Sequence, residues 1–252
     1  LWYSLEAHHN DPGFENEFIA VDDVSRERMS CHPWNFDVIG EAIKQAIEKV
    51  QTIRLREFLN DDIGVCTMTN ADDIFVLEDD VIRRLDLPTH RTPLYHQGEE
   101  LKNWAGYPEQ RLLNPYDDNC HILPEGELDE HVLSYLKPFQ EVLEQRHSFG
   151  SKTFRELGRV WYEFERMNAT KYSADAYIVF PFISTHAHFQ PLFDNRTFGR
   201  HTQVLTLPVH REEKDYYLLV AVLNSSVALA WLKQVCFNKG AGADEHRDRY
   251  EF

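Results

Sequence analysis

The sequence has no long apolar run and no signal peptide. None of its apolar runs approaches the roughly 18 residues that a membrane-spanning helix needs. The N-terminal residues LWYSLEAHHNDPG become polar within six positions. We therefore expect a cytoplasmic protein with no membrane partner. Because the chain begins with Leu1 rather than Met, we also expect it to be part of a longer protein.

The sequence also lacks the short motifs that mark common catalytic and nucleotide-binding sites. The phosphate-binding patterns GxGxxG and GxxxxGK[ST] are absent, and so is the nucleophile pattern GxSxG. Neighbouring side chains on a strand point to opposite faces, so we interpret the paired acidic residues as turn and surface charges rather than metal ligands. These pairs are Asp22-Asp23, Asp61-Asp62, Asp72-Asp73 and Asp79-Asp80. The chain itself is expected to be non-catalytic, with no cofactor and no metal.

Cysteine is scarce and widely spaced. The cysteines form no CxxC pair, which favours reduced thiols in a cytosolic protein. A zinc site is the alternative, although adjacent residues seldom both reach one metal ion. It would use Cys31-His32 and Cys120-His121; the other cysteines are Cys66 and Cys236. His186 and His188 would share one face of a strand and suit a metal, but no third ligand is evident.

Basic residues are few and unevenly distributed. The 26 Lys and Arg residues stand against 42 Asp and Glu residues, and the net charge of −16 argues against a simple nucleic-acid binder. Residues 61–145 carry a net charge of −13, whereas residues 146–252 carry +2. Within the latter, residues 146–211 hold nine basic residues, five acidic residues and five histidines. Such a basic stretch indicates a local phosphate-binding surface, with a solvated face of mixed charge as the alternative.

Hydrophobic periodicity predicts several helices and short strands. Apolar residues at helical spacing predict an amphipathic helix over residues 38–50. Two short apolar runs, 65–68 and 74–77, predict a hairpin joined by a turn at 69–72. The other predicted helices span residues 128–146, with a break at Pro138, 155–166 and 224–235. The other predicted strands lie near residues 111–113, 121–123, 176–183 and 204–207, while 216–221 fit a strand or the start of a helix. Without regular βαβ alternation, the predicted class is α+β, with short mixed strands and several packing helices.

The segment Asn114-Pro115-Tyr116 is similar to a catalytic motif of amino-methylating enzymes. Those enzymes use Asn-Pro-Pro-Tyr or a close variant to hold the target amino group and stack on the flipped base. Here only one proline is present, and Asp117-Asp118 follows, which would be unfavourable beside a DNA phosphate. We interpret the segment as a turn.

Seven ordered segments carry a family resemblance. They are IGVCTMTNADDIFVL (63–77), LLNPYDD (112–118), YLKPFQEVLEQR (135–146), WYEFER (161–166), IVFPFIS (178–184), YLLVAVLNSSVALAWLK (217–233) and GAGADEHRDRYEF (240–252). Together they resemble the C-terminal target-recognition region of adenine-N6 DNA methyltransferases. This family includes the fused methylases of type IIG restriction–modification enzymes and those of phage-defence systems such as BREX.

The resemblance implies a two-part enzyme. An upstream methyltransferase domain of the same polypeptide would bind S-adenosylmethionine and flip the target adenine. Residues 61–252 would form the target-recognition domain that binds double-stranded DNA, after an N-terminal segment and connecting helix at residues 1–60. The parent protein would be a site-specific DNA adenine-N6 methyltransferase, with or without restriction activity. The net charge of −16 departs from the more basic pattern of the family.

The resemblance and the basic stretch together predict the DNA-contacting residues. The predicted hairpin would present Thr and Asn side chains to a groove, where Asn can make a two-bond contact to adenine. Cationic side chains would neutralise phosphates and fix the register. The predicted set is Thr67, Thr69, Asn70, Arg146, Lys152, Arg155, Arg159, Lys171, His186, His188, Arg196 and Arg200. Trp161, Tyr162 and Phe164 are instead expected in the core.

Two other functions stay open. The acidic stretch 61–145 would suit a protein-interaction module that docks a basic partner within a restriction or phage-defence complex. An independent enzyme of unknown type is the other alternative, and no motif in the sequence supports it.

Overall fold

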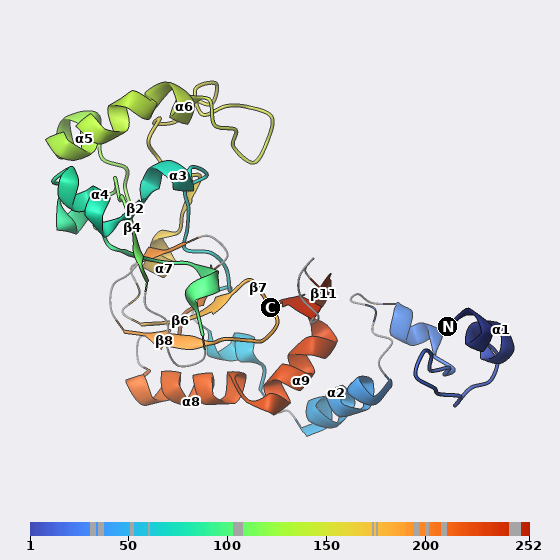
Figure 1. Ribbon diagram of the computed structural model, residues 1–252. Helices are drawn as coiled ribbons and strands as arrows, with labels where there is room; N and C mark the ends of the chain where they lie inside the picture. Colours follow the sequence, from blue (N-terminus) through green and yellow to red (C-terminus); the bar gives the residue numbers. More distant parts are fainter. Residues whose placement is uncertain are drawn as a thin grey trace. The chain divides into compact units, whose positions relative to one another are not determined.

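The computed structural model describes most of the chain. It leaves out residues 31–33, 35–37, 51–52, 60, 103–107, 173, 175, 194–196, 200–201, 208–210 and 242–247, and it describes only the backbone of residues 28, 38–39, 197–198, 205 and 241. The described residues form short helices and short, mostly antiparallel strands, which confirms the predicted α+β class (Figure 1). Their contacts divide the chain into two compact units, Leu1–Thr52 with Ser226–Glu251 (unit 1) and Ile53–Ser225 with Phe252 (unit 2). The sequence placed a boundary between residues 60 and 61, and the functional division proposed there stays a prediction.

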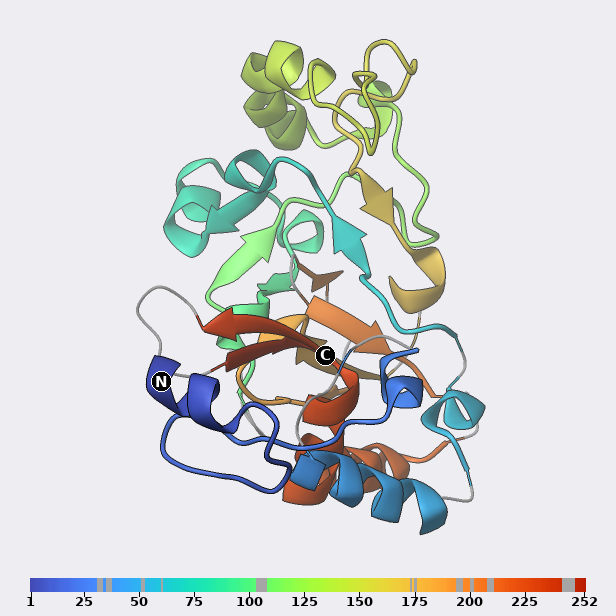
Figure 2. The same cartoon turned by 90° about the vertical axis from the view of Figure 1, so that its right-hand side faces the viewer.

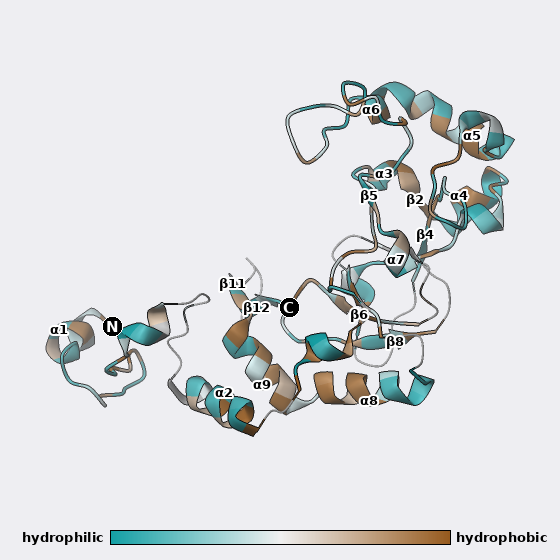
Figure 3. Cartoon of the chain, turned by 180° about the vertical axis from the view of Figure 1, so that it is seen from behind, coloured by the Kyte–Doolittle hydropathy of each residue, from teal (hydrophilic) through white to brown (hydrophobic). Residues whose placement is uncertain are grey.

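Unit 1 is built around two packed helices. The predicted helices are present as α2 (Val38–Val50) and α9 (Ser226–Val235), which pack against each other. Figure 3 shows hydrophilic and hydrophobic residues alternating along α2, as expected for a helix with one packed face. The Trp231 indole donates a hydrogen bond to the Glu48 carboxylate at 3.2 Å. The remaining elements are α1 (Trp2–His8), η1 (Arg26–Met29) and the hairpin of β11 (Phe237–Ala241) and β12 (Asp248–Glu251).

Unit 2 contains three small sheets. One has the order β2 (Val76–Glu78), β4 (Gln110–Leu112), β3 (Leu94–His96) and β9 (Thr197–Phe198), with β3 and β9 parallel. The second is antiparallel, with β6 (Tyr177–Pro181) between β10 (Thr202–Leu205) and β8 (Gln190–Leu192). The third pairs β1 (Thr67–Met68) with β5 (Arg166–Met167), and β7 spans Ile183–Ser184. Every residue of β6 is buried, consistent with its continuous apolar sequence.

Several short helices accompany these sheets in unit 2. The predicted helix over 128–146 is present as α5 (Glu130–Leu136) and α6 (Gln140–Glu144), separated at Pro138 by the 3-10 turn η6 (Lys137–Phe139). Residues 216–221 belong to a helix, α8 (Glu213–Leu223). The others are α3 (Asp72–Phe75), α4 (Asp79–Arg84), α7 (Ala169–Tyr172), η2 (Leu55–Phe58), η3 (Thr89–Arg91), η4 (Gly98–Glu100) and η5 (Glu125–Glu127). No single described helix has both the length and the composition of a membrane span, although α8 and α9 reach them when taken together.

The largest core lies in unit 2 and confirms the aromatic residues predicted for it. Trp161, Tyr162 and Phe164 are buried, and the ring of Phe164 meets that of Phe75 edge to face at 5.2 Å. The Tyr116 hydroxyl accepts the backbone N–H of Phe164 at 2.7 Å. This core therefore joins segments that lie far apart in the sequence.

The predicted hairpin over 65–77 is wrong. Strand β1 pairs with β5 and strand β2 pairs with β4, so the two strands belong to different sheets. Between them, the Thr69 hydroxyl accepts the N–H of Ala71 at 3.0 Å and donates to the Asp72 carboxylate, which starts helix α3. Hydrogen bonds of the Thr69 side chain and the start of a helix thus replace the expected two-strand turn.

The predicted helix over 155–166 is also wrong. Residues 154–158 form turns, and Gly158 adopts a left-handed conformation with φ of 66°. The N–H of Arg159 returns to the carbonyl of Phe154 at 3.0 Å. The aromatic residues whose spacing suggested a helix lie in an irregular segment and pack into the core.

Candidate nucleic-acid interface

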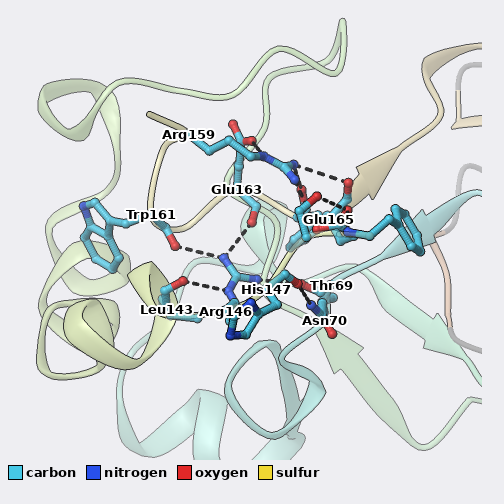
Figure 4. Close-up of polar contacts among 12 residues, drawn as sticks. Thr69, Asn70, Leu143, Arg146, His147, Arg159, Trp161, Glu163 and Glu165 are labelled. Carbon is cyan, nitrogen blue, oxygen red and sulfur yellow. Dashed lines mark hydrogen bonds and ion pairs between the residues drawn. The ribbon is translucent and has the colours of Figure 1, made fainter. Parts of the chain in front are cut away.

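A buried arginine organises the surface that the sequence assigned to DNA. Arg146 is only 8% exposed and donates four hydrogen bonds, all to backbone carbonyls (Figure 4). Its Nε bonds Leu143 at 3.0 Å and its Nη1 bonds Thr69 at 2.6 Å. Its Nη2 bonds Trp161 and Glu163, both at 2.9 Å. One guanidinium therefore ties together the end of α6, the turn before α3 and the segment 161–163.

Aromatic rings and burial complete the environment of Arg146. Its guanidinium lies 4.2 Å from the ring centroid of Phe154 and 5.6 Å from that of Phe75. Burial lowers the pKa of Arg146 to about 10, which still leaves it protonated at neutral pH. The Arg146 cation therefore contacts groups inside the protein rather than a partner at the surface.

A second arginine connects this centre to a neighbouring carboxylate. Arg159 pairs with the carboxylates of Glu163 and Glu165, the latter at 3.1 Å, and donates to the Phe164 carbonyl at 2.7 Å. Glu165 is 9% exposed and accepts hydrogen bonds from the Ser148 hydroxyl at 2.8 Å and the Phe149 N–H at 3.4 Å. The Arg159–Glu165 ion pair is thus linked by hydrogen bonds to the loop that follows α6.

That loop, residues 147–153, projects from the end of α6 (Figures 1 and 2). A bridge between His147 and Thr153 closes its base, and the N–H of Ser148 bonds the Lys152 carbonyl at 3.2 Å. Asn70 adopts a left-handed conformation with φ of 56°, and its amide donates to the His147 carbonyl at 2.8 Å. The 147–153 loop and the exposed Asn70 therefore form one continuous surface.

The structure places ten of the twelve predicted DNA contacts, and their environments differ. Thr67, Thr69, Arg146 and Lys171 are buried. Lys171 bonds the Asp62 carbonyl and lies 3.7 Å from the Asp61 carboxylate, so its charge is used internally. Arg155 is exposed but paired with Glu144, and Arg159 is half-buried. Asn70 and Lys152 are exposed, whereas Arg196 and Arg200 lie outside the described residues.

The two predicted histidines lie beyond strand β7 rather than on it. The rings of His186 and His188 are 6.1 Å apart, and both side chains are partly buried. Burial lowers the pKa of His188, and the nearby Lys102 and His186 lower it further, which favours the neutral imidazole at pH 7. The described parts of the chain contain no group of three or more potential metal ligands.

Sequence reasoning missed two residues of this surface. Phe149 is 69% exposed in the 147–153 loop, and the exposed Arg166 guanidinium lies 5.2 Å from its ring centroid. Arg166 begins β5, opposite Met68 of β1, which brings it beside the turn at Asn70. The tract Ser-Phe-Gly-Ser-Lys, an aromatic residue among turn-forming residues, was a usable signal. Assigning residues 155–166 to a helix hid the position of Arg166.

The segment Asn114-Pro115-Tyr116 is a turn, as predicted. The Asn114 side-chain oxygen accepts the Tyr116 N–H at 3.2 Å, and its amide donates to the Tyr172 hydroxyl at 3.3 Å. Asn114 and Tyr116 are buried, with the Tyr116 hydroxyl bonded inside the core. This geometry leaves neither side chain free to hold a flipped base.

The chain is similar to parts of two larger proteins. No family model matches the chain. The chain is 25% identical over 263 residues to the adenine-specific methyltransferase PglX of Streptomyces coelicolor, an alignment that covers 100% of this chain but only 22% of PglX. Its structure is similar to that of the type IIL restriction–modification enzyme MmeI in complex with DNA, with a TM-score of 0.50 and 15% identity over 69% of this chain and 22% of MmeI. The chain is thus homologous to part of an adenine-specific methyltransferase and shares its fold with part of a restriction–modification enzyme.

Proposed function

We propose that this chain is the sequence-recognition part of a DNA adenine-N6 methyltransferase. It would bind double-stranded DNA and position the target adenine for a catalytic domain elsewhere in the same polypeptide. The observation that carries this proposal is the alignment of the whole chain with only 22% of PglX. Two features support it: the sequence has no glycine-rich loop to hold S-adenosylmethionine, and Asn114 and Tyr116 are engaged in a structural turn. Cofactor binding and methyl transfer are therefore assigned to the rest of the parent enzyme.

The surface formed by Asn70, the 147–153 loop and Arg166 is the proposed DNA contact. Lys152 and Arg166 are exposed, and neither forms an ion pair with a described carboxylate, although the charge of Lys152 also acts on the nearby Glu156. Both cations can therefore contact phosphates. Arg155, by contrast, is neutralised by Glu144. In this proposal Arg146 serves DNA binding indirectly, by holding the surface in place.

Salt-dependent binding tests this assignment. Anisotropy of a labelled mixed-sequence duplex would be measured from about 50 to about 200 mM salt, a range over which phosphate contacts weaken binding steeply. We expect Lys152→Gln and Arg166→Gln each to reduce the slope of log affinity against log salt by about 0.9. The control is Lys214→Gln, because Lys214 is similarly exposed but pairs with Glu212 at 2.6 Å. An absence of salt-sensitive binding at low salt, for both the chain and the full-length polypeptide that contains it, would refute the proposal.

The acidic surface of residues 61–145 supports a second candidate, a protein-interaction module of a restriction or phage-defence complex. Around α3 and α4, Asp73 and Asp80 are exposed, and no ion pair joins either to a described residue. Replacing both with Lys separates the two functions. For a DNA reader, the added charge strengthens non-specific DNA binding; for a docking surface, it abolishes association with a basic partner such as the remainder of the enzyme.

A further inference from the structure

A solvent-exposed aromatic ring at the end of the 147–153 loop is not explained by the fold. Phe149 is 69% exposed, more than any other Phe, Tyr or Trp described in unit 2. An apolar ring in this position contributes nothing to the core. The ring lies on the surface formed by Asn70, the 147–153 loop and Arg166, which the proposed function assigns to DNA.

Hydrogen bonds within the loop and to Glu165 support the backbone that carries this ring. The Glu165 carboxylate accepts hydrogen bonds from the Ser148 hydroxyl and the Phe149 N–H, and Arg159 pairs with the same carboxylate. The His147 ring bonds the Ser151 carbonyl at 3.1 Å, across the loop. Because these bonds exist before any partner binds, little conformational entropy would be lost on binding.

The charges around the ring suit a polyanion. Arg166 stacks on Phe149, and the exposed Lys152 lies three residues further along the loop. The nearby Glu156 accepts the N–H and hydroxyl of Thr153, at 2.7 and 3.1 Å, so its carboxylate is engaged locally. A ring suited to bases beside cations suited to phosphates fits nucleic acid better than a protein groove.

We propose that the 147–153 loop is a DNA insertion element in which Phe149 enters the base stack while Lys152 and Arg166 contact flanking phosphates. This inference rests on the proposed function and names the residue that would touch the bases. The side chain of Phe149 has no hydrogen-bonding group, so it does not read base edges but fills the space of an unstacked base. An adenine must leave the duplex to be modified, and an inserted apolar side chain stabilises the opened duplex.

The test compares two mixed-sequence duplexes that differ only in one abasic site. Such a gap offers space for an inserted ring whatever the recognition sequence. We expect the 252-residue chain, and the full-length polypeptide, to bind the abasic duplex about tenfold more tightly. Phe149→Ala should lose this preference and keep the salt dependence, while Phe149→Trp should retain both. Val142→Ala is the control, because Val142 is a 62% exposed apolar residue on the adjacent α6.

The outcomes distinguish failure of the insertion element from failure of the proposed function. Equal affinity of the wild-type chain for the two duplexes, or an unchanged preference in Phe149→Ala, overturns the insertion element but leaves salt-sensitive DNA binding intact. Absence of any wild-type binding overturns the proposed function and the insertion element together. If Phe149→Ala instead loses association with the rest of the methyltransferase, the ring is a protein contact. Thermal unfolding of Phe149→Ala should match that of the wild type, because an exposed ring contributes little to stability.

Discussion

At the scale of single residues, the arginines and lysines of the basic stretch divide by what they contact. Arg146 and Lys171 are buried and bonded to backbone carbonyls, so their charge stabilises the fold. Arg155 forms an ion pair with Glu144 at the surface. Lys152 and Arg166 are exposed and form no ion pair with a described carboxylate. Identical residue types therefore have different roles, set by burial and by their neighbours.

The difference between a buried and an exposed arginine can be measured as the loss in the free energy of unfolding when each is replaced. Arg146→Met leaves several buried carbonyls without a donor, so we expect it to lower the free energy of unfolding by about 3 kcal/mol or more. Arg155→Met removes only an exposed ion pair and should cost less than about 1 kcal/mol. Urea denaturation of both variants provides the comparison. Similar losses for the two would show that the carbonyl contacts of Arg146 contribute little.

His188 makes the stability of unit 2 depend on pH. Its pKa is lowered from the ordinary 6.5, so between the two pKa values the unfolded chain binds more protons than the folded chain. We expect its contribution to stability to be complete above pH 6.5 and to fall as the pH drops below that value.

An NMR titration of the His188 ring measures the shift directly. Its midpoint should lie below 6.5 and move upwards in Lys102→Met, which removes one of the neighbouring charges that lower it. A wild-type midpoint at or above 6.5 would contradict the assignment.

At the scale of elements, local chain reversals decide which strands meet. The turn at Thr69 and Asn70 starts α3 and separates β1 from β2, so β1 pairs with a strand nearly one hundred residues away. Gly158, in its left-handed conformation, reverses the chain before the buried aromatic segment. With these two reversals, β5 pairs with β1, and Arg166 lies opposite Met68 and beside Asn70.

The reversal at Gly158 can be tested with a matched glycine. A Cβ atom at Gly158 or at Gly126 would meet no atom within 4 Å, but only Gly158 has a positive φ, of 66°. We expect Gly158→Ala to destabilise the protein by about 1 kcal/mol through backbone strain alone. Gly126→Ala should be neutral or stabilising by about 0.5 kcal/mol. Equal effects on thermal unfolding would show that the conformation of Gly158 is not required.

At the scale of the whole molecule, added salt should change the stability of the protein and its affinity for DNA in opposite directions. The net charge of −16 makes folding work against self-repulsion, while DNA binding depends on a few local cations. Raising the salt concentration from about 20 to about 200 mM should therefore raise the Tm, by about 2–4 °C for each kcal/mol of repulsion relieved. Over the same range the DNA affinity should fall. A Tm that drops with salt would show that surface ion pairs outweigh the net charge.

Much of the secondary structure could be predicted because its signals are local. The helices α2 and α9 and the α5–α6 pair follow from apolar residues at helical spacing and from one proline. The aromatic core residues were also predictable from their apolar character. The pairing of β1 with β5 was not, because it depends on contacts distant in the sequence. Of the candidate site, sequence indicated the basic stretch and the exposed Asn70 and Lys152, but not the position of Phe149 and Arg166.

The sequence by itself determined the α+β class, the main helices, the uneven charge and the resemblance to adenine methyltransferases. It also excluded a nucleotide-binding glycine loop within this chain. Only the tertiary structure decided which cations are internal and which remain for a partner. The physical reason is that a guanidinium can donate hydrogen bonds to backbone carbonyls as well as to phosphates. At Arg146, the carbonyls became its partners only when the turn at Thr69 and the segment 161–163 folded around the side chain, beside the local carbonyl of Leu143.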